Sequence, residues 1–326
     1  MKKLFKFILF TTLLVMILVV IFFFWASSPT LSSRAYSELK EYETSQINEN
    51  DSVFKVVTYN IGYLSGMTNN RAVIKPKKLF DDNLNLVISE FKKENPSIIA
   101  FQEIDYDANR SFNVNQEKEI SQSLGYQYAA NSINWDETYL PFPYWPPSVH
   151  FGKVLSGQSV ISKCPIISQE RVVLERVKEN PFYREAFYLE RLAQVVKMLI
   201  NKQEVVLINV HLEAFNSTTR RNQYKKVVSI FKKYAKEYPT ILLGDFNSEA
   251  RNKKGAIQEL LSDKDVGCAA FNLEEIKNTF NSIQPDKRID YIFFTKNTIQ
   301  YLEGDVLERF GEASDHLPVA MSFKLK

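Results

Sequence analysis

A long apolar run near the N-terminus is the first feature of the hydrophobic and polar pattern. Residues 7–26 contain no charged side chain, and Thr11 and Thr12 are their only polar positions. A helix of this length rises about 1.5 Å per residue and so covers the roughly 30 Å hydrocarbon core of a membrane. The pattern therefore predicts one N-terminal transmembrane helix that ends near Ala26.

The residues around this run indicate an uncleaved signal anchor rather than a cleaved signal peptide. A cleavable apolar segment is shorter, roughly 7–15 residues, and ends at a site with small residues. Here Phe24 places a bulky side chain before Ala26, and a cut after Ser28 would leave Pro29 first. We therefore predict a single-pass protein of the cell membrane. Its N-terminal tip stays in the cytoplasm, and the rest of the chain lies on the extracytoplasmic side.

Polar residues follow the anchor before the apolar pattern resumes. Residues 27–52 contain one proline and no glycine, and their composition is typical of a stalk or linker. From residue 53 to residue 326, short apolar runs alternate with amphipathic stretches, and no Pro/Gly/Ser-rich linker divides them. We therefore predict three parts: a cytoplasmic tip and anchor over 1–26, a stalk over 27–52, and one domain over 53–326.

The elements expected within this domain mix strands and helices. Strands are expected at 53–59, 97–101, 205–210, 240–243, 289–294 and 318–323, and amphipathic helices at 77–93 and 218–236. Strands outnumber helices, and the strand-rich stretch from 156 to 210 favours hairpins over a strict alternation of strands and helices. A β-rich, layered α/β domain accounts for this pattern.

The net charge of +3 belongs to the N-terminal tip. Lys2, Lys3 and Lys6 are the only charged residues before Arg34, and the remaining 38 Lys and Arg balance 38 Asp and Glu. A neutral domain argues against a nucleic-acid binder that works through a large basic face, because phosphate contacts need clustered cations. The ordinary content of hydrophobic and charged residues excludes a disordered or collagen-like chain.

Polar side chains lie at one end of each of six predicted strands. The six segments are Tyr59–Asn60, Gln102–Glu103, Asn209–His211, Asp245–Asn247, Arg288–Tyr291 and Ser314–His316. In layered α/β folds, strand ends and the loops beside them build sites, because the sheet holds these loops rigidly. Carboxylates are costly to bury without partners. Four carboxylates and two histidines at one rim therefore suggest a divalent cation and acid–base chemistry.

The same segments carry motifs that resemble those of the endonuclease/exonuclease/phosphatase superfamily, the DNase-like metal-dependent phosphoesterases. The motifs are TYNIG (58–62), FQEID (101–105), NVHLE (209–213), GDFNS (244–248), RIDYIF (288–293) and SDHLP (314–318). They occur in the order typical of the superfamily, and the resemblance extends from about residue 53 to 323. It implies a four-layered α/β/β/α sandwich, preceded here by the transmembrane helix, with the active site at one sheet edge.

The resemblance also implies a role for each of eight residues. Glu103 would be the principal Mg²⁺ ligand, with Asn60 and Asp315 close to the metal, and Mn²⁺ would be a second suitable ion. The catalytic group would consist of His211, Asp245, Asn247, Asp290 and His316. The two histidines would bracket the scissile phosphate, with Asp290 orienting His316. Asp245 would position or deprotonate the attacking water, and Asn247 would donate to a phosphate oxygen. The pattern leaves open whether Asp245 or His316 takes the water proton.

The aromatic and proline-rich stretch Asn131–Gly157 is the least regular part of the chain. It contains four of the twelve prolines and two of the three tryptophans, a composition that favours an irregular loop over a helix or strand. Such a loop could form a substrate-facing rim or could pack flat over the sheet edge. Its His150, Lys153 and Trp145, together with Arg288 near the fifth strand, are the expected substrate-binding residues.

These features predict an extracytoplasmic, divalent-metal-dependent hydrolase of phosphate esters, either a phosphodiesterase, nucleases included, or a phosphomonoesterase. The histidine of NVHLE disfavours the abasic-site endonucleases, and Leu242–Leu243 before the fourth motif departs from the inositol-phosphatase pattern. Accessible substrates are extracellular nucleic acid, phospholipid head groups and phosphorylated envelope material. The alternatives are a lipid head-group phosphodiesterase of the sphingomyelinase type and a non-catalytic binding module on the same fold. No obligate protein partner is expected.

The chain contains only two cysteines, Cys164 and Cys268. Outside the cytoplasm they could form one disulfide if the fold brings their Cα atoms within reach. Two cysteines also disfavour a structural zinc site, which takes four ligands from cysteine and histidine.

Overall fold

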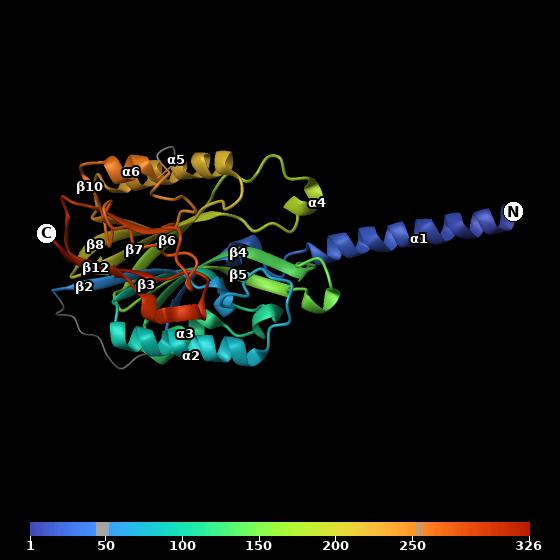
Figure 1. Ribbon diagram of the computed structural model, residues 1–326, viewed down its shortest axis with the longest axis horizontal. Helices are drawn as coiled ribbons and strands as arrows, with labels where there is room; N and C mark the ends of the chain where they lie inside the picture. The colour runs from blue at the N-terminus through green and yellow to red at the C-terminus, as the bar shows by residue number, and fades with distance from the viewer. Residues whose placement is uncertain (44–51, 253–254, 256) are drawn as a thin grey trace.

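Two β-sheets pack face to face at the centre of the domain (Figure 1). The seven strands of the first sheet are, in order, β1 (Ser37–Glu41), β4 (Tyr128–Leu140), β5 (Gly152–Ser162), β3 (Ile98–Asp105), β2 (Phe54–Asn60), β13 (Val319–Leu325) and β12 (Ile299–Val306). The six strands of the second are β10 (Val266–Cys268), β11 (Asp290–Thr295), β9 (Thr240–Asp245), β8 (Gln203–His211), β7 (Leu192–Ile200) and β6 (Ile166–Val173). This computed structural model describes residues 1–43, 52–252, 255 and 257–326.

Helices cover the outer face of each sheet (Figure 1). The first sheet carries α2 (Lys77–Glu94) and α3 (Gln116–Leu124), and the second carries α5 (Ser217–Tyr234) and α6 (Gln258–Ser262). Each long helix buries one apolar stripe. In α2 this stripe contains Phe80, Val87 and Phe91, and the helix ends at Asn95, whose left-handed backbone caps it. The expected four-layered α/β/β/α sandwich is confirmed.

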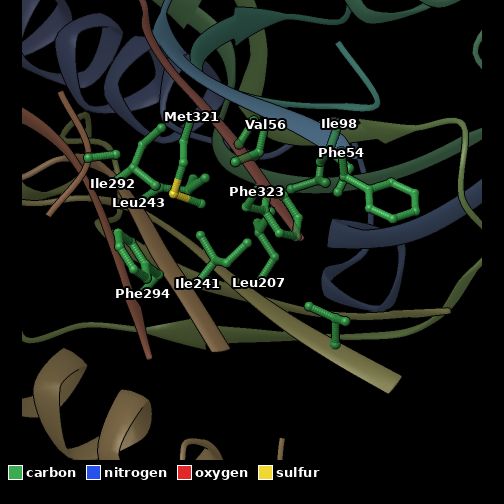
Figure 2. Close-up of a cluster of buried hydrophobic side chains, with 14 of the residues drawn as sticks. Phe54, Val56, Ile98, Leu207, Ile241, Leu243, Ile292, Phe294, Met321 and Phe323 are labelled. Atoms are coloured by element: carbon green, nitrogen blue, oxygen red, sulfur yellow. The ribbon is translucent and has the colours of Figure 1, made fainter. Parts of the chain in front are cut away.

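The core between the two sheets depends on the alternation of side chains along each strand. In β2, Phe54 and Val56 point toward the second sheet, whereas Val57 and Tyr59 belong to the cluster beneath α2. Figure 2 shows the inter-sheet cluster, where Val56 lies near Met321, and Ile241 and Leu243 come from the second sheet. Full burial of each such side chain contributes about 1.5–3 kcal/mol. Because each face of β2 packs in a buried cluster, the strand carries apolar side chains on both faces.

Two parallel strand pairs bring four strand ends to one rim of the domain. Helix α2 connects β2 to its parallel neighbour β3, and α5 connects β8 to its parallel neighbour β9. Each helical crossover returns the chain to the same side, so both strands of a pair end at the same edge. Contacts of β2 and β3 with β9, and of β3 with β8, bring the two edges together.

Residues 28–42 pack on the domain, and the prediction of a stalk is wrong for them. Strand β1 adds to the sheet edge beside β4, and the amide of Thr138 donates to the carbonyl of Ser28 at 2.9 Å. An edge strand is held by backbone hydrogen bonds and needs no apolar pattern, which is why its polar sequence suggested a linker. Residues 44–51 of the predicted stalk lie outside the described residues.

The predicted irregular loop over 131–157 is also mostly strand. Strand β4 continues to Leu140 and β5 begins at Gly152, so only residues 141–151 form a turn. All four prolines of the stretch lie inside this turn, where no sheet hydrogen bond is lost. The irregular, proline-rich part is therefore confined to the turn, and the residues on both sides of it are strand.

Helix α1 (Lys2–Ala26) projects away from the sandwich (Figure 1). It is long and apolar enough to cross a membrane, with no buried residue in its most apolar window. Both cysteines lie in the described ranges, and Cys268 is a free thiol, so they form no disulfide with each other. Burial raises the pKa of Cys268 to about 12.

Candidate active site

Seven of the eight residues expected in the catalytic centre meet at the rim where the parallel strands end. Asn60, His211 and Asp245 are the last residues of β2, β8 and β9, and Asp290 is the first residue of β11. His211 and Asp245 are register partners across the β8–β9 pair, as are Asp290 and Asp245 across β9–β11. Asp315 and His316 precede β13, and Glu103 lies near the end of β3. The rim therefore collects these side chains from both sheets.

Glu103 owes its position to a β-bulge. The register between β3 and β5 shifts between Phe101 and Ile104, and Glu103 has a positive φ of 52°. That backbone conformation is uncommon for residues other than glycine, and such strain is found where a fold holds a functional side chain in place. Here it aims the carboxylate into the site, where Nδ2 of Asn69 donates to its Oε2 at 3.0 Å.

Glu103 and Asp315 form a pair of neighbouring acids. The same Asn69 amide lies 3.4 Å from Oδ1 of Asp315. Burial, and next the charge of Asp315, raise the pKa of Glu103. Asn60 completes the group, with its Nδ2 3.4 Å from Glu103 Oε1. The two neighbouring carboxylates are hard oxygen donors of the kind that Mg²⁺ and Mn²⁺ prefer, so this pair fits a divalent cation. The amide oxygen of Asn60 instead accepts from the backbone amide of Gly62 at 3.2 Å.

Asp245, Asp290 and His316 form a second acidic group that could hold a metal ion. Their ligand atoms all lie within 4.8 Å of one another. However, Nδ1 of His316 lies 3.0 Å from Oδ2 of Asp290, as in a histidine–carboxylate ion pair. Although burial lowers it, the neighbouring carboxylate of Asp290 raises the pKa of His316 well above its usual value. A protonated imidazole cannot bind a metal, so this group suits acid–base and phosphate contacts better.

His211 is held in a different state. Its Nε2 lies 2.6 Å from Nη1 of Arg191, and because a guanidinium only donates, the imidazole has to accept. Burial, and next the charge of Arg191, lower the pKa of His211 well below its usual value. The proton then sits on Nδ1, which has no hydrogen-bond partner among the described residues. The site thus pairs a neutral His211 with a protonated His316.

Asp245 lies between the two histidines. Its Oδ2 is 3.6 Å from Nε2 of His211 and 3.8 Å from Nε2 of His316, and it accepts from Nδ2 of Asn60 at 3.1 Å. Burial, and next the charge of Asp290, raise the pKa of Asp245 to about 7. A carboxylate placed in this way can take a proton near neutral pH.

Asn247, the eighth expected residue, is positioned by the turn after β9. Its backbone amide donates to Oδ1 of Asp245 at 2.8 Å, and its side-chain amide donates to the carbonyl of Leu212 at 3.0 Å. Its φ is positive at 47°. The residue lines the same cavity as His211 and Asp245, but its side-chain amide is engaged by the protein here.

A cavity of about 1050 Å³ opens onto these side chains. One part of its wall is polar and includes Glu103, Asp315 and the two histidines. Another part is apolar and contains aromatic and aliphatic side chains, namely Tyr63, Trp135, Leu140, Phe142, Tyr144, Tyr183, Phe187, Leu189 and Phe215. A cavity of this size accepts a ligand with a polar group at one end and an apolar portion at the other.

The four expected substrate-binding residues do not line this cavity. The two ring nitrogens of His150 contact the hydroxyl of Tyr139 in β4 and the carbonyl of Tyr144 in the turn, and Lys153 pairs with Asp107. The guanidinium of Arg288 is buried and donates to backbone carbonyls, including that of Asp290 at 2.7 Å. Trp145 is exposed. The structure therefore places these four residues outside the lining of the cavity that contains the rim.

Three further residues of the site were not predicted from the sequence, namely Asn69, Arg191 and Glu213. Arg191 stands immediately before β7, and Glu213 closes the NVHLE motif, so the rule of polar residues at strand ends could have found both. Glu213 lies 3.5 Å from Nε of Arg191 and accepts from the hydroxyl of Tyr188. Asn69 lies in an irregular loop whose sequence carries no comparable signal.

Comparison with known families agrees with this geometry. The model of the Endonuclease/Exonuclease/phosphatase family matches residues 57–316, which include every residue of the rim. The chain belongs to this family. Within it, the rim described above occupies the stretch that carries the family motifs. A search of curated protein sequences finds no match.

Solved structures of the family share the fold. An endonuclease/exonuclease/phosphatase from Beutenbergia cavernae is 20% identical, with a TM-score of 0.63 over 84% of this chain and 72% of that one. The catalytic domain of human Nocturnin, with a bound sulfate anion, is 16% identical (TM-score 0.59; 91% and 100% covered). A mannosyl-6-phosphatase from Bacteroides thetaiotaomicron is 17% identical (TM-score 0.58; 84% and 99% covered). At these identities the likeness concerns the fold.

Proposed function

We propose that this protein is a divalent-metal-dependent hydrolase of phosphate esters. The observation that carries the proposal is the position of Asp245 Oδ2, less than 4 Å from Nε2 of both His211 and His316. A base flanked by two imidazoles of different protonation state, beside a pair of acids, is an arrangement suited to displacement at phosphorus. Family membership supports the same reaction class.

Glu103 and Asp315 would hold the metal ion, with Asn60 close to it. When bound, a divalent cation supplies positive charge that stabilises the developing negative charge on a phosphoryl oxygen. The remaining residues act on the substrate and the water. His316, kept protonated by Asp290, would donate to a phosphoryl oxygen, and Arg191 adds a fixed positive charge behind His211.

The proposed reaction is the hydrolysis of one phosphate ester bond. The oxygen of water forms a bond to phosphorus, and the ester bond between phosphorus and the leaving oxygen breaks. Asp245 takes the proton of the attacking water and later returns it to the solvent. The leaving alkoxide takes a proton from bulk water, so the products are an alcohol and a phosphate. Asp245 is the base in this scheme because His316 already carries a proton.

We further propose that α1 crosses the cell membrane and that the catalytic domain lies on the extracytoplasmic side. Its length and composition support the crossing, and Lys2, Lys3 and Lys6 favour a cytoplasmic N-terminus. A reporter fused to the C-terminus tests the orientation. Alkaline phosphatase should be active there, and green fluorescent protein should be dark if it is exported through the general secretory route.

The test of activity uses the purified full chain in detergent with an aryl phosphodiester and an aryl phosphomonoester. Turnover should require Mg²⁺ or Mn²⁺, stop with a chelator, and fall by about 10³-fold or more in Asp245→Asn. The control is Asp265→Asn, an exposed aspartate next to β10 and outside the cavity lining. The absence of turnover on every phosphate ester would instead favour a non-catalytic binding module.

A further inference from the structure

Helix α1 is fixed to the catalytic domain by its C-terminal end. Ala26 is fully buried, and Oγ of Ser28 lies 2.9 Å from Oγ1 of Thr138 in β4. The carboxylate of Asp136 accepts from the backbone amides of Thr30 at 2.8 Å and Leu31 at 2.9 Å. If α1 crosses a membrane, the domain is therefore not connected to it by a flexible linker. It presents a defined face to the lipid surface.

That face carries exposed aromatic side chains from two segments that are far apart in sequence. Tyr144 and Trp145 come from the β4–β5 turn, and Phe182 and Tyr183 from α4 (Phe182–Glu185). Their exposed fractions are 74%, 77%, 76% and 59%. Figure 1 shows α4 and this turn on either side of the C-terminal end of α1. We call these four residues the aromatic collar.

Ring contacts join the apolar helix to one collar residue, Phe182, and to two further aromatic side chains of the domain. The ring of Phe23 in α1 packs edge-on against Phe182 at 5.8 Å and against Phe187 at 5.7 Å. On the other side, Trp25 stacks on Tyr139, with ring centroids 5.9 Å apart. Tryptophan and tyrosine gather where a membrane-spanning helix leaves the hydrocarbon core, because their rings are amphipathic. The collar lies at that level of α1.

The apolar part of the cavity reaches the same place. Tyr144 and Tyr183 belong both to the collar and to the cavity wall, and Phe187 touches the cavity on one side and Phe23 on the other. The cavity thus runs from the carboxylates and histidines of the rim to the base of α1. Arg184, within α4, also lines it and provides a cation at the depth of lipid head groups.

We propose that the aromatic collar is seated in the interfacial layer of the bilayer and that the cavity takes the phosphate head group of a membrane lipid. The inference rests on the proposed function and names its substrate class. The phosphate would reach Asp245 and the two histidines. The apolar wall would hold the first part of the lipid that leaves the membrane. Hydrolysis breaks one bond between phosphorus and an ester oxygen, with water supplying the new oxygen.

A lipid fits these observations better than a nucleic acid. Aromatic walls also stack on bases, but apart from its N-terminal tip the chain carries as many acids as bases, and strand binders rely on a continuous basic groove. A lipid arrives from the surface on which the collar sits.

The test reconstitutes the full chain in vesicles that contain phosphatidylglycerol and phosphatidylcholine, with Mn²⁺, and follows release of the head group. A soluble aryl phosphodiester is measured in parallel. The key variant is Trp145→Gln/Phe182→Gln, because both residues belong to the collar and neither lines the cavity. It should release head groups at least tenfold more slowly, with turnover of the soluble ester within twofold of wild type. The control is Leu273→Gln, which is 70% exposed and lies outside both collar and cavity lining.

A second measurement follows the position of the collar without relying on activity. Brominated lipids should quench Trp145, seen as a larger loss of fluorescence in wild type than in Trp145→Phe. Equal quenching in the two proteins would overturn the seating of the collar.

The outcomes separate this inference from the proposed function. Turnover of the aryl ester while both lipids stay intact would overturn the lipid substrate and leave the hydrolase standing. Plasmid cleavage that the collar variant leaves unchanged, again with intact lipids, would replace the lipid by nucleic acid. If no phosphate ester is hydrolysed, both proposals fail.

Discussion

Nη1 of Arg191 and Nε2 of His211 lie 2.6 Å apart in a buried contact. The arginine reaches across the sheet from the residue before β7 to the end of β8 and lies near Glu213 as well. It fixes which nitrogen of His211 carries the proton. A single buried guanidinium thereby sets the chemistry of one histidine of the site, and the family motifs do not include it.

The first prediction concerns this contact. Arg191→Lys keeps the charge but loses the planar fork that serves both His211 and Glu213, so kcat should fall by about tenfold to a hundredfold. Arg191→Met should in addition lower the melting temperature, since an unpaired buried carboxylate costs about 3–5 kcal/mol. Arg176→Lys is the control, because Arg176 is partly exposed, pairs with Glu185 and does not line the cavity. An unchanged kcat and pH profile in Arg191→Lys would contradict the assignment.

The second prediction concerns Asp290 as a positioning residue for His316. Asp290→Asn keeps the shape of the side chain but removes the negative charge 3.0 Å from Nδ1 of His316. The pKa of His316 should therefore fall, so that this histidine gives up its proton at a lower pH than in the wild type. We expect kcat to fall by about 10³-fold with little change in KM, as when the carboxylate partner of a catalytic histidine is removed. The pH–rate profile should change shape as well. A purely structural role would lower stability and leave that profile in place.

The third prediction concerns the pair of acids. Glu103→Gln removes one of the two carboxylates that face each other through Asn69. Calorimetric titration of the purified protein with Mn²⁺ should show at least tenfold weaker binding, because hard cations depend on carboxylate charge. Glu259→Gln, on the outer surface of α6, serves as the control. If Mn²⁺ binds both variants equally, the metal site lies elsewhere.

The fourth prediction concerns stability as a function of pH. Glu137 in β4 has a buried Oε2 without a hydrogen-bond partner among the described residues. Burial, and next the charge of Asp136, raise its pKa to about 9, while Arg176 opposes the shift. In the unfolded chain the value is about 4.3. The stability from the protonated form is therefore complete below about pH 4 and is lost as the pH rises toward 9.

Glu137→Gln keeps the shape and removes this titration. Its melting temperature should exceed that of the wild type at pH 8 by several degrees, since an unsatisfied buried group costs about 1–3 kcal/mol. The difference should shrink toward pH 5. Equal melting curves at both pH values would show that the carboxylate is solvated.

The strand ends could be predicted from sequence because each buried strand is an apolar run and the first polar residue after it marks its end. Asn60, His211, Asp245 and Asp290 belong to this group. The bulge at Glu103 could not be predicted, since it depends on a register shift against β5. The direction of Arg288 could not be predicted either, because this first residue of the RIDYIF motif turns inward and donates to carbonyls that are distant in sequence.

Strand β1, which follows the anchor helix in sequence, forms one edge of the seven-stranded sheet. Beginning an expressed domain at Val53, as the predicted boundary suggests, would strip the backbone of β4 from Tyr128 to Ser132 of its neighbour. An uncovered edge of this kind pairs readily with another copy. A well-behaved soluble version should therefore begin between Ala26 and Ser28, keeping the residues that hold Asp136 and complete the sheet.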